Sequence, residues 1–205
     1  MDEKLIEFPV LGEPFPIELA NTRYRDGDNI VDFVETQLLF EAWLLASPTP
    51  GKRKRPARWN RESHLALLAV RDSVAMLINA AVDHRVPDAA SITSINHAAQ
   101  GCRFVTELRW SREGPSSIDH VHGKSAFDIF VGQIAIETIE LLSGPNAAAL
   151  QRCQSEDCWM LFLKNHPRRR WCHNSCGHRN RQANCYYRAR GLRYPERSDH
   201  NASTR

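Results

Sequence analysis

Four cysteines near the C-terminal end of the sequence could hold a metal ion. They form two close pairs, Cys153-x4-Cys158 and Cys172-x3-Cys176, with thirteen residues between the pairs. This spacing is typical of a structural zinc site, in which two tight turns each supply two thiolates to a tetrahedral Zn²⁺. Disulfides are the alternative, and they are disfavoured in a reducing compartment. We therefore predict a Zn²⁺ cofactor bound by Cys153, Cys158, Cys172 and Cys176.

The other two cysteines and the nearby histidines are not needed for this site. Cys185 lies nine residues past Cys176, about two and a half helical turns, so it should miss the metal. We expect Cys185 and Cys102 to be small buried side chains. His166 and His173 could each replace a ligand, but four cysteines already complete the coordination. We therefore expect both histidines to be solvated.

Positive charge is concentrated around the cysteines. The whole chain carries a net charge of +3, but residues 151–194 contain ten basic and two acidic residues, which gives +8 there and −5 for the remainder. Four thiolates and one Zn²⁺ carry about −2 in total, and cationic neighbours favour the thiolate form. The excess positive charge indicates a negatively charged partner, nucleic acid above all. The candidate contacts are Arg168, Arg169, Arg170, Arg179, Arg181, Arg188 and Arg190.

Composition places the chain among ordinary globular proteins. Its 205 residues can form one core with a small appended module, and its apolar and charged fractions, 42% and 25%, are average. The first residues are too acidic and too rich in proline for a secretory signal. The apolar stretch 126–142 is interrupted by four polar or charged residues, so we predict no membrane span and a cytoplasmic protein. We find no phosphate-binding Gly-rich loop, serine elbow or His-Glu-x-x-His pattern, and so predict that the protein is not an enzyme.

Apolar periodicity predicts a helical body. The first helix is expected over residues 28–47, with an apolar side that includes Val34, Leu38 and Leu45. A second helix is expected from Arg61 to His84, and its predicted apolar side is Leu65, Leu68, Ala69, Asp72, Met76 and Ala80.

Three further elements complete the expected body. Asp88 should cap a third helix, and residues 103–110 and 116–123 should form a short hairpin. The strongest helical pattern covers residues 124–144, with Ser125 near its start and Gly144 as its stop signal.

The segment after residue 145 predicts a small metal-dependent module. Residues 159–164 suit a strand, residues 165–170 suit a turn and a return strand, and residues 177–190 suit a helix. A knuckle, a hairpin and a helix that supplies the last ligand pair form a treble-clef-like arrangement. We therefore expect a mostly α fold. Residues 1–145 would be a helical N-terminal domain with a short β-hairpin, residues 146–194 a C-terminal treble-clef-like zinc finger, and residues 195–205 a disordered tail.

The C-terminal motif resembles the CGNR zinc-finger family. It reads C-x4-C-x13-C-x3-C-G-x-R, with LFL after the first pair and RRRWC opening the second. Upstream, IELANTRYRDGDNIVDF, AWL and LLAVRDSVAMLINA are similar to the ABATE domain that usually precedes this finger, and together the two cover nearly the whole chain. His178 stands where the family has its signature Asn, and Lys164 where an acidic residue is common. The resemblance implies zinc binding and a nucleic-acid-binding, stress-related transcription regulator.

The leading interpretation is a zinc-dependent, DNA-binding transcription regulator, with the helical domain as a sensor or dimerisation unit. Arginines on the helix after Cys176 could enter a major groove and read guanine edges or hold phosphate. Trp159, Trp171, Tyr186 and Tyr187 lie among the arginines and leave RNA binding as an alternative. The arginines could instead only balance the thiolates, which would leave a zinc-stabilised protein-interaction module. We favour DNA over RNA, and leave a homodimer and a small-molecule effector open.

Overall fold

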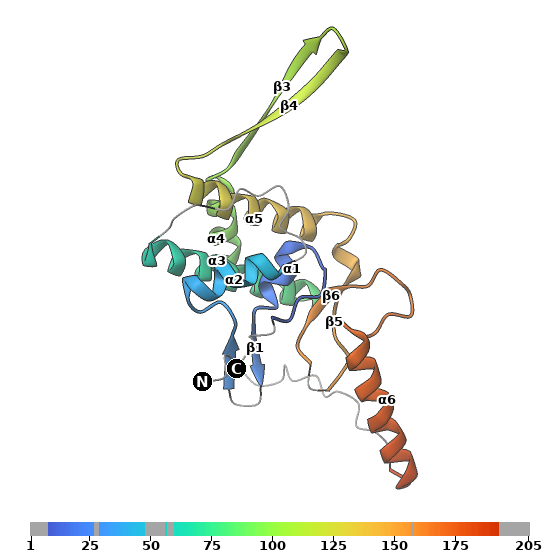
Figure 1. The fold of residues 1–205 in the computed structure, drawn as a ribbon. Helices are drawn as coiled ribbons and strands as arrows, with labels where there is room; N and C mark the ends of the chain where they lie inside the picture. Colours follow the sequence, from blue (N-terminus) through green and yellow to red (C-terminus); the bar gives the residue numbers. More distant parts are fainter. Residues whose placement is uncertain (1–7, 27–28, 48–55, 57–59, 157, 193–205) are drawn as a thin grey trace.

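The computed structural model describes residues 8–26, 29–47, 56, 60–156 and 158–192. A helical body is centred on α3 (Arg61–Val82), which contacts α1 (Phe15–Ala20), α4 (Ala89–Ala99) and α5 (Ala126–Ser143). A two-stranded arm and helix α6 (Asn174–Ala189) extend from opposite ends of this body (Figure 1). The helical domain with a β-hairpin and a C-terminal finger confirms the predicted fold class, although the described residues form three antiparallel strand pairs rather than one or two.

The core of the body is formed by apolar side chains from these helices and from α2 (Gln37–Ala46). Ile17 of α1, Trp43 of α2 and Ile134 of α5 are inaccessible to solvent. Each large apolar side chain that leaves water contributes about 1.5–3 kcal/mol. The helices are therefore held around α3 mainly by this shared apolar surface.

Local sequence signals define the ends of the body helices. Asn60, Asp88 and Ser125 each accept a hydrogen bond from the backbone N–H three residues later, at 2.8, 2.7 and 3.0 Å. These side chains satisfy N–H groups that the first helical turn leaves unpaired. The predicted caps Asp88 and Ser125 are confirmed, and α5 ends at Gly144 as predicted.

Residues 29–36 do not belong to the helix that was predicted over residues 28–47. Asn29–Asp32 form β2, which pairs antiparallel with β1 (Arg23–Asp26), and α2 begins only at Gln37. Asp32 explains the difference. It accepts hydrogen bonds from the backbone N–H two residues later, at 3.1 Å, and from the buried guanidinium of Arg71 in α3, at 2.7 Å. A distant partner thus overrides the local helical pattern.

The buried sides of α2 and α3 differ in part from those that periodicity predicts. In α2, Leu38 and Leu45 are exposed, whereas Phe40 and Trp43 are buried. In α3, the predicted Leu65 and Met76 are exposed, and the core is contacted by His64, Leu67, Val70, Val74, Leu77 and Ile78. Both helices carry large apolar side chains on more than one side, so periodicity alone does not select the buried one.

By length and composition, α3 is apolar enough to be considered as a membrane span, unlike the stretch 126–142. It nevertheless lies in the centre of the body, where eight of its residues are buried. One of these is Arg71, which forms an ion pair with Asp32 at 2.7 Å. Packing on three other helices identifies α3 as the core helix of a globular domain.

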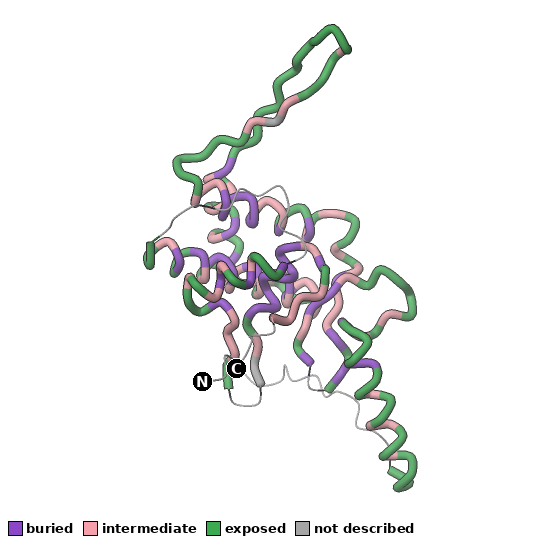
Figure 2. Tube along the Cα trace, viewed as in Figure 1, coloured by how far each residue is buried: buried purple, intermediate pink, exposed green. Residues whose placement is uncertain are grey.

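The predicted hairpin is an arm that projects from the body. β3 (Arg103–Ser111) and β4 (Gly114–His122) pair antiparallel without interruption along their whole length. All nine residues of β3 are exposed, and Figure 2 shows the arm exposed over most of its length. Gly114 begins β4 with φ of 118°, which residues with a side chain rarely adopt. The hairpin is confirmed, and it extends well beyond the body.

The C-terminal module begins after α5. A short 3-10 helix (Ala147–Ala149) leads to β5 (Leu150–Arg152), which pairs antiparallel with β6 (Leu161–Leu163). The return strand predicted over residues 165–170 is wrong, because these residues form a turn and the partner of β6 precedes the first cysteine. Leu150 and Leu161 belong to the core of the body. The tail predicted for residues 195–205 lies outside the described part of the chain.

Candidate metal centre

The four predicted zinc ligands converge on one point. Cys153, Cys158, Cys172 and Cys176 are buried, and their sulfur atoms all lie within 4.8 Å of one another. The Sγ–Sγ distances are 3.6 Å for Cys158–Cys172 and 3.7 Å for Cys172–Cys176. A tetrahedral Zn²⁺ with Zn–S bonds of about 2.3 Å separates its sulfur ligands by about 3.8 Å. The cluster therefore has the size of a zinc site, and all six cysteines of the chain are free thiols rather than disulfides.

The first ligand pair lies in the tight turn between β5 and β6. The Cys153 N–H donates to the Met160 carbonyl at 2.8 Å, and the Cys158 N–H donates to the Ser155 carbonyl at 3.1 Å. These bonds fold the turn so that both thiols face the same side. Phe162 of β6 is buried against the four cysteines and supports the turn.

The second ligand pair lies at the start of α6. His173 caps the helix, since its Nδ1 accepts from the Ser175 N–H at 3.2 Å, and Cys176 lies in the first turn. The helix therefore begins two residues before Cys176 rather than after it. Gly177 allows close packing here, because a Cβ at this position would lie 3.1 Å from Cε3 of Trp171. The metal thus holds the first turn of α6 against the knuckle.

Four thiolates cannot coexist in this space without a cation. Hydrogen bonds from the Cys158 and Cys172 thiols hold the pKa of Cys153 at about 2. The same contact with Cys153 raises the pKa of Cys158 to about 12, and contacts with Cys153 and Cys158 raise the pKa of Cys172 as well. One ionised sulfur therefore opposes ionisation of its neighbours. A divalent cation at the centre removes this opposition and permits all four to bind as thiolates.

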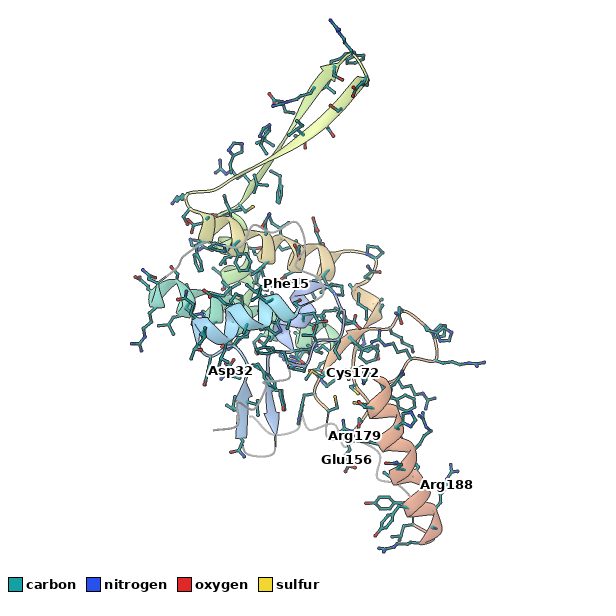
Figure 3. The ribbon with its side chains drawn as sticks, in the orientation of Figure 1. Phe15, Asp32, Glu156, Cys172, Arg179 and Arg188 are labelled. Atoms are coloured by element: carbon teal, nitrogen blue, oxygen red, sulfur yellow. The ribbon has the colours of Figure 1, made fainter. Side chains whose placement is uncertain are left out.

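Hydrogen-bond donors around the sulfur atoms reduce the remaining negative charge. The Cys172 N–H points at Cys153 Sγ at 3.4 Å, and Nη2 of Arg179 lies 3.2 Å from Cys176 Sγ. Figure 3 shows Arg179 on the first part of α6, near Cys172. A zinc–tetrathiolate cluster of about −2 is stabilised by such donors. Arg179 therefore serves the metal centre directly, whatever else it contacts.

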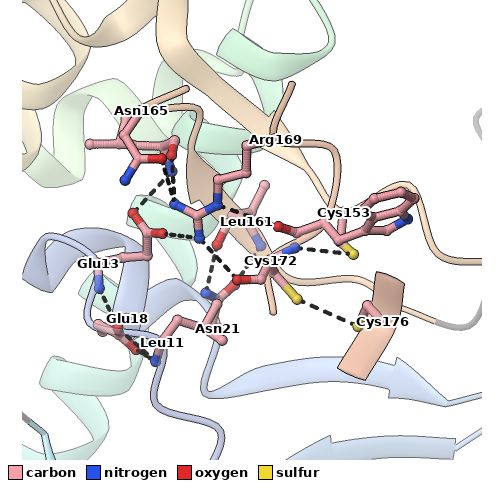
Figure 4. Close-up of polar contacts among 12 residues, drawn as sticks. Leu11, Glu13, Glu18, Asn21, Cys153, Leu161, Asn165, Arg169, Cys172 and Cys176 are labelled. Carbon is pink, nitrogen blue, oxygen red and sulfur yellow. Dashed lines mark hydrogen bonds and ion pairs between the residues drawn. The ribbon is translucent and has the colours of Figure 1, made fainter. Parts of the chain in front are cut away.

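The structure holds the partly buried Arg169 against other parts of the chain. Its guanidinium donates to Glu13 Oε1 at 2.8 Å, to the Leu163 carbonyl at 2.9 Å and to the Cys172 carbonyl at 2.9 Å (Figure 4). It also stacks over the Phe162 ring, 4.5 Å from the ring centre. These contacts use the planar donor fork that a phosphate would need. Arg169 is therefore a residue that joins the finger to the body.

The three arginines of α6 and its C-cap residue Arg190 lie on two sides of the helix. Arg181 and Arg188 are seven residues apart, and Arg179 and Arg190 are eleven apart, so each pair shares a side and the two pairs face nearly opposite directions. The Arg190 guanidinium stacks 4.1 Å from the centre of the exposed Tyr186 ring. The helix has no acidic residue between Asn174 and Ala189. The predicted arginine cluster is thus divided between two sides.

A cleft of about 540 Å³ lies between the start of α6 and the loop that precedes Cys172. Arg168, Arg169 and Arg170 line it from the loop, and Arg181 lines it from the helix. None of the residues that line it is acidic; the others include Asn165, His166, His173, Asn174, Gly177 and His178. His178, which replaces the signature Asn of the resembling family, therefore faces the same basic cleft. The arrangement can accept a dispersed negative charge.

Two long-range contacts at the metal module were not anticipated from the sequence. Glu13 accepts from the Leu163 N–H at 3.0 Å in addition to Arg169, and Asn21 bonds both backbone groups of Leu161 (Figure 4). Asn21 lies in the stretch that resembles the ABATE domain, and its separation of 140 residues from Leu161 leaves no local signal of the contact. These residues position the finger without touching the metal.

The remaining cysteines and histidines are placed as follows. Cys102 is buried as predicted, and burial raises the pKa of its thiol. Cys185 is exposed, so its predicted burial is wrong, because most residues in the outer half of α6 are exposed. His166 and His173 are exposed as predicted, and His173 in addition caps α6.

Two family models match the chain. Residues 13–145 match ABATE, described as "Putative stress-induced transcription regulator", and residues 150–190 match the CGNR zinc finger. No curated protein is significantly similar to the sequence. The first match covers more than half of the chain, and the second contains all four of the clustered cysteines.

Proposed function

Because the chain belongs to the ABATE family and carries a CGNR zinc finger, we propose that it is a transcription regulator that binds DNA through this finger. Zinc binding follows from the four converging cysteines. DNA binding is the further step, and the distribution of charge around the zinc supports it. The protein would act in the cytoplasm as a binding protein rather than as an enzyme, with the helical body as its sensor.

One observation carries the proposal: an acid-free helix begins at the metal and carries arginines on the side that borders a basic cleft. The zinc ligand Cys176 lies in the first turn of α6. Arg181 and Arg188 share one side of this helix, and Arg168 and Arg170 face Arg181 across the cleft. Figure 3 shows Arg188 further along α6 than Arg179. A rigid helix with exposed guanidinium groups is suited to phosphate, because each guanidinium can donate two parallel hydrogen bonds.

The dimensions favour duplex DNA over single-stranded RNA. α6 has sixteen residues and a length of about 24 Å. An α-helix with its side chains is about 10–12 Å across, which fits a major groove about 12 Å wide. Sequence-specific RNA recognition instead uses aromatic platforms on which bases stack. Here the ring of Tyr186 is occupied by Arg190, and Trp171 packs against Gly177. Two of the four aromatic residues that suggested RNA are therefore engaged within the finger.

A salt titration tests the proposal. If Arg168, Arg170, Arg181 and Arg188 each neutralise one phosphate, log affinity for duplex DNA should fall against log salt with a slope of about −3.6. The double variant Arg181→Glu/Arg188→Glu should weaken binding strongly. Its slope should become shallower, about −1.8 or closer to zero. The matched control Arg61→Glu/Lys124→Glu changes the net charge equally with exposed residues of the body and should have a small effect.

Three results would contradict the proposal. Equal losses in the two double variants would place the binding surface elsewhere. Tighter binding to single-stranded RNA than to duplex DNA would favour the RNA alternative. No binding to either at low salt would leave the finger as a protein-interaction module whose arginines balance the thiolates.

A further inference from the structure

The arm formed by β3 and β4 has two chemically different sides. Alternate residues of a strand point to the same side of a sheet, and the register pairs Phe104 with Val121, Leu108 with Ser117 and Trp110 with Pro115. This side of the arm therefore carries mainly apolar residues, interrupted where the register pairs Thr106 with Asp119, and Asp119 is the one charged residue at its register positions. We define the arm stripe as Phe104, Leu108, Trp110, Pro115 and Val121.

The opposite side of the arm is mainly polar and internally paired. There the register places Val105 opposite His120 and Glu107 opposite Ile118. Glu107 Oε2 lies 2.9 Å from Nε2 of His120 and 3.9 Å from Nη2 of Arg109. These contacts satisfy the charged groups of this side across the strands. In the described part of the chain, the arm stripe is the side of the arm that no other apolar surface covers.

The arm stripe is a large and strongly exposed apolar patch. Phe104, Leu108 and Trp110 are 51%, 71% and 76% exposed. At these exposures the two aromatic rings alone present about 200–300 Å² to solvent, so the whole stripe falls among the largest apolar patches found on monomers. A two-stranded hairpin is also marginally stable in water unless something covers its apolar side. The arm thus requires a partner.

Charge and area identify a second copy of the chain as that partner. Residues 103–122 contain three arginines (103, 109 and 112) and three acidic residues (107, 113 and 119), so the arm has no net charge from these groups. Two arms therefore have no net charge that would keep them apart at long range, and the arm has no excess charge to attract nucleic acid. Two stripes in contact, with their polar margins, would bury roughly 1,000 Å², near the lower limit for a specific interface. An apolar stripe is self-complementary, as a two-fold contact demands.

We propose that the protein forms a two-fold dimer in which the arm stripes of two copies pack face to face. The apolar side chains of each arm then cover those of the other, and the four strands form two layers with a mainly apolar interior. The arm and α6 extend from opposite ends of the body (Figure 1). Pairing through the arms therefore keeps both zinc fingers at the outer ends of the dimer, with both α6 helices accessible. The dimer does not depend on whether those helices bind DNA.

Sedimentation equilibrium of the full-length, zinc-loaded protein tests this proposal. The wild type should reach twice the chain mass of 23.4 kDa as concentration rises. Leu108→Lys places a charge in the centre of the stripe and should raise the dimer dissociation constant by about 30-fold or more. Val105→Lys is the matched control, because Val105 is exposed on the same strand but on the opposite side, and it should leave the dissociation constant nearly unchanged.

Folding is checked separately, so that a misfolded variant does not imitate a dissociated one. Each variant should keep the wild-type far-ultraviolet circular dichroism and one equivalent of zinc, and Trp110→Lys at the tip of the arm provides a second test of the stripe. A wild type that stays monomeric at all concentrations would overturn the proposal. It would also fail if the dimer persisted in both stripe variants, or if Val105→Lys dissociated it as strongly as Leu108→Lys.

Discussion

The side-chain amide of Asn21 pairs with the backbone of Leu161 through two hydrogen bonds. Its Nδ2 donates to the Leu161 carbonyl at 2.9 Å, and its Oδ1 accepts from the Leu161 N–H at 2.8 Å. All of these groups are buried. Asn21 follows α1 and Leu161 lies in β6, so the amide occupies the place that a neighbouring strand would take. This contact joins the helical body to the strand that follows the zinc knuckle.

Replacing Asn21 with alanine should destabilise the whole chain. The variant leaves a buried N–H and a buried carbonyl of Leu161 without partners, which should lower the free energy of unfolding by about 2 kcal/mol or more. Chemical denaturation of the zinc-loaded protein measures this. Asn180→Ala is the control, because the Asn180 side chain accepts a hydrogen bond from Asn184 within α6, and the change should stay within about 0.5 kcal/mol. Similar losses in both variants would show that the Asn21 contact has no special role.

Removing zinc should loosen the body as well as the finger. The wild type should contain a single equivalent of zinc by metal analysis, which Cys176→Ser should abolish and Cys185→Ser should retain. Because Leu150 and Leu161 belong to the core of the body, the zinc-free variant should also melt at a lower temperature when the helical signal is followed. An unchanged helical melting curve would mean that the finger folds separately from the body.

Arg179 should tune zinc affinity, and Arg181 should not. Arg179→Ala removes a cationic donor 3.2 Å from the Cys176 sulfur, and loss of such an outer contact typically lowers metal affinity about 10- to 100-fold. Competition with a coloured zinc chelator measures the change. Arg181→Ala on the opposite side of α6 serves as the control and should leave the zinc affinity unchanged. Equal effects would indicate a general influence of charge rather than the contact with sulfur.

Glu18 should make stability depend on pH. Burial raises the pKa of this carboxyl above its usual value of 4.5, although the N–H groups of Glu13 and Leu11 donate to it and partly oppose the shift. A raised folded-state pKa means that the contribution of Glu18 to stability is full below the unfolded value and is lost as pH rises through the folded value. The glutamine side chain in Glu18→Gln does not ionise, so its contribution to stability does not fall as pH rises. Its unfolding free energy relative to wild type should therefore increase as pH rises above 4.5.

Denaturant titrations of both proteins at a series of pH values, all in zinc-saturated buffer, test the Glu18 prediction. Zinc loss at low pH affects both proteins and cancels in the difference. A difference that stays constant across the series would show that the Glu18 carboxyl titrates alike in the folded and unfolded chains.

Features that depend on short stretches of chain could be predicted from the sequence. The zinc ligands are such a case, because each pair occupies one tight turn and the spacing alone reveals the two turns. The caps Asp88 and Ser125 are another, since each bonds the backbone only three residues away. The hairpin of β3 and β4 is equally local. In all of these, the interacting groups are close along the chain, so their residue types and spacing contain the necessary information.

Features that depend on distant partners were decided by the tertiary structure. Asp32 stays out of a helix because Arg71 binds it, and Leu65 of α3 is exposed although its apolar character suggested the core. From the sequence, Arg169 is expected to be one more exposed cation in a run of arginines. In the structure it donates a hydrogen bond to Glu13, 156 residues away. The same holds for Asn21 and Leu161. A side chain's partner is selected by packing of the whole core, and the free energy of that packing is not encoded in any single segment.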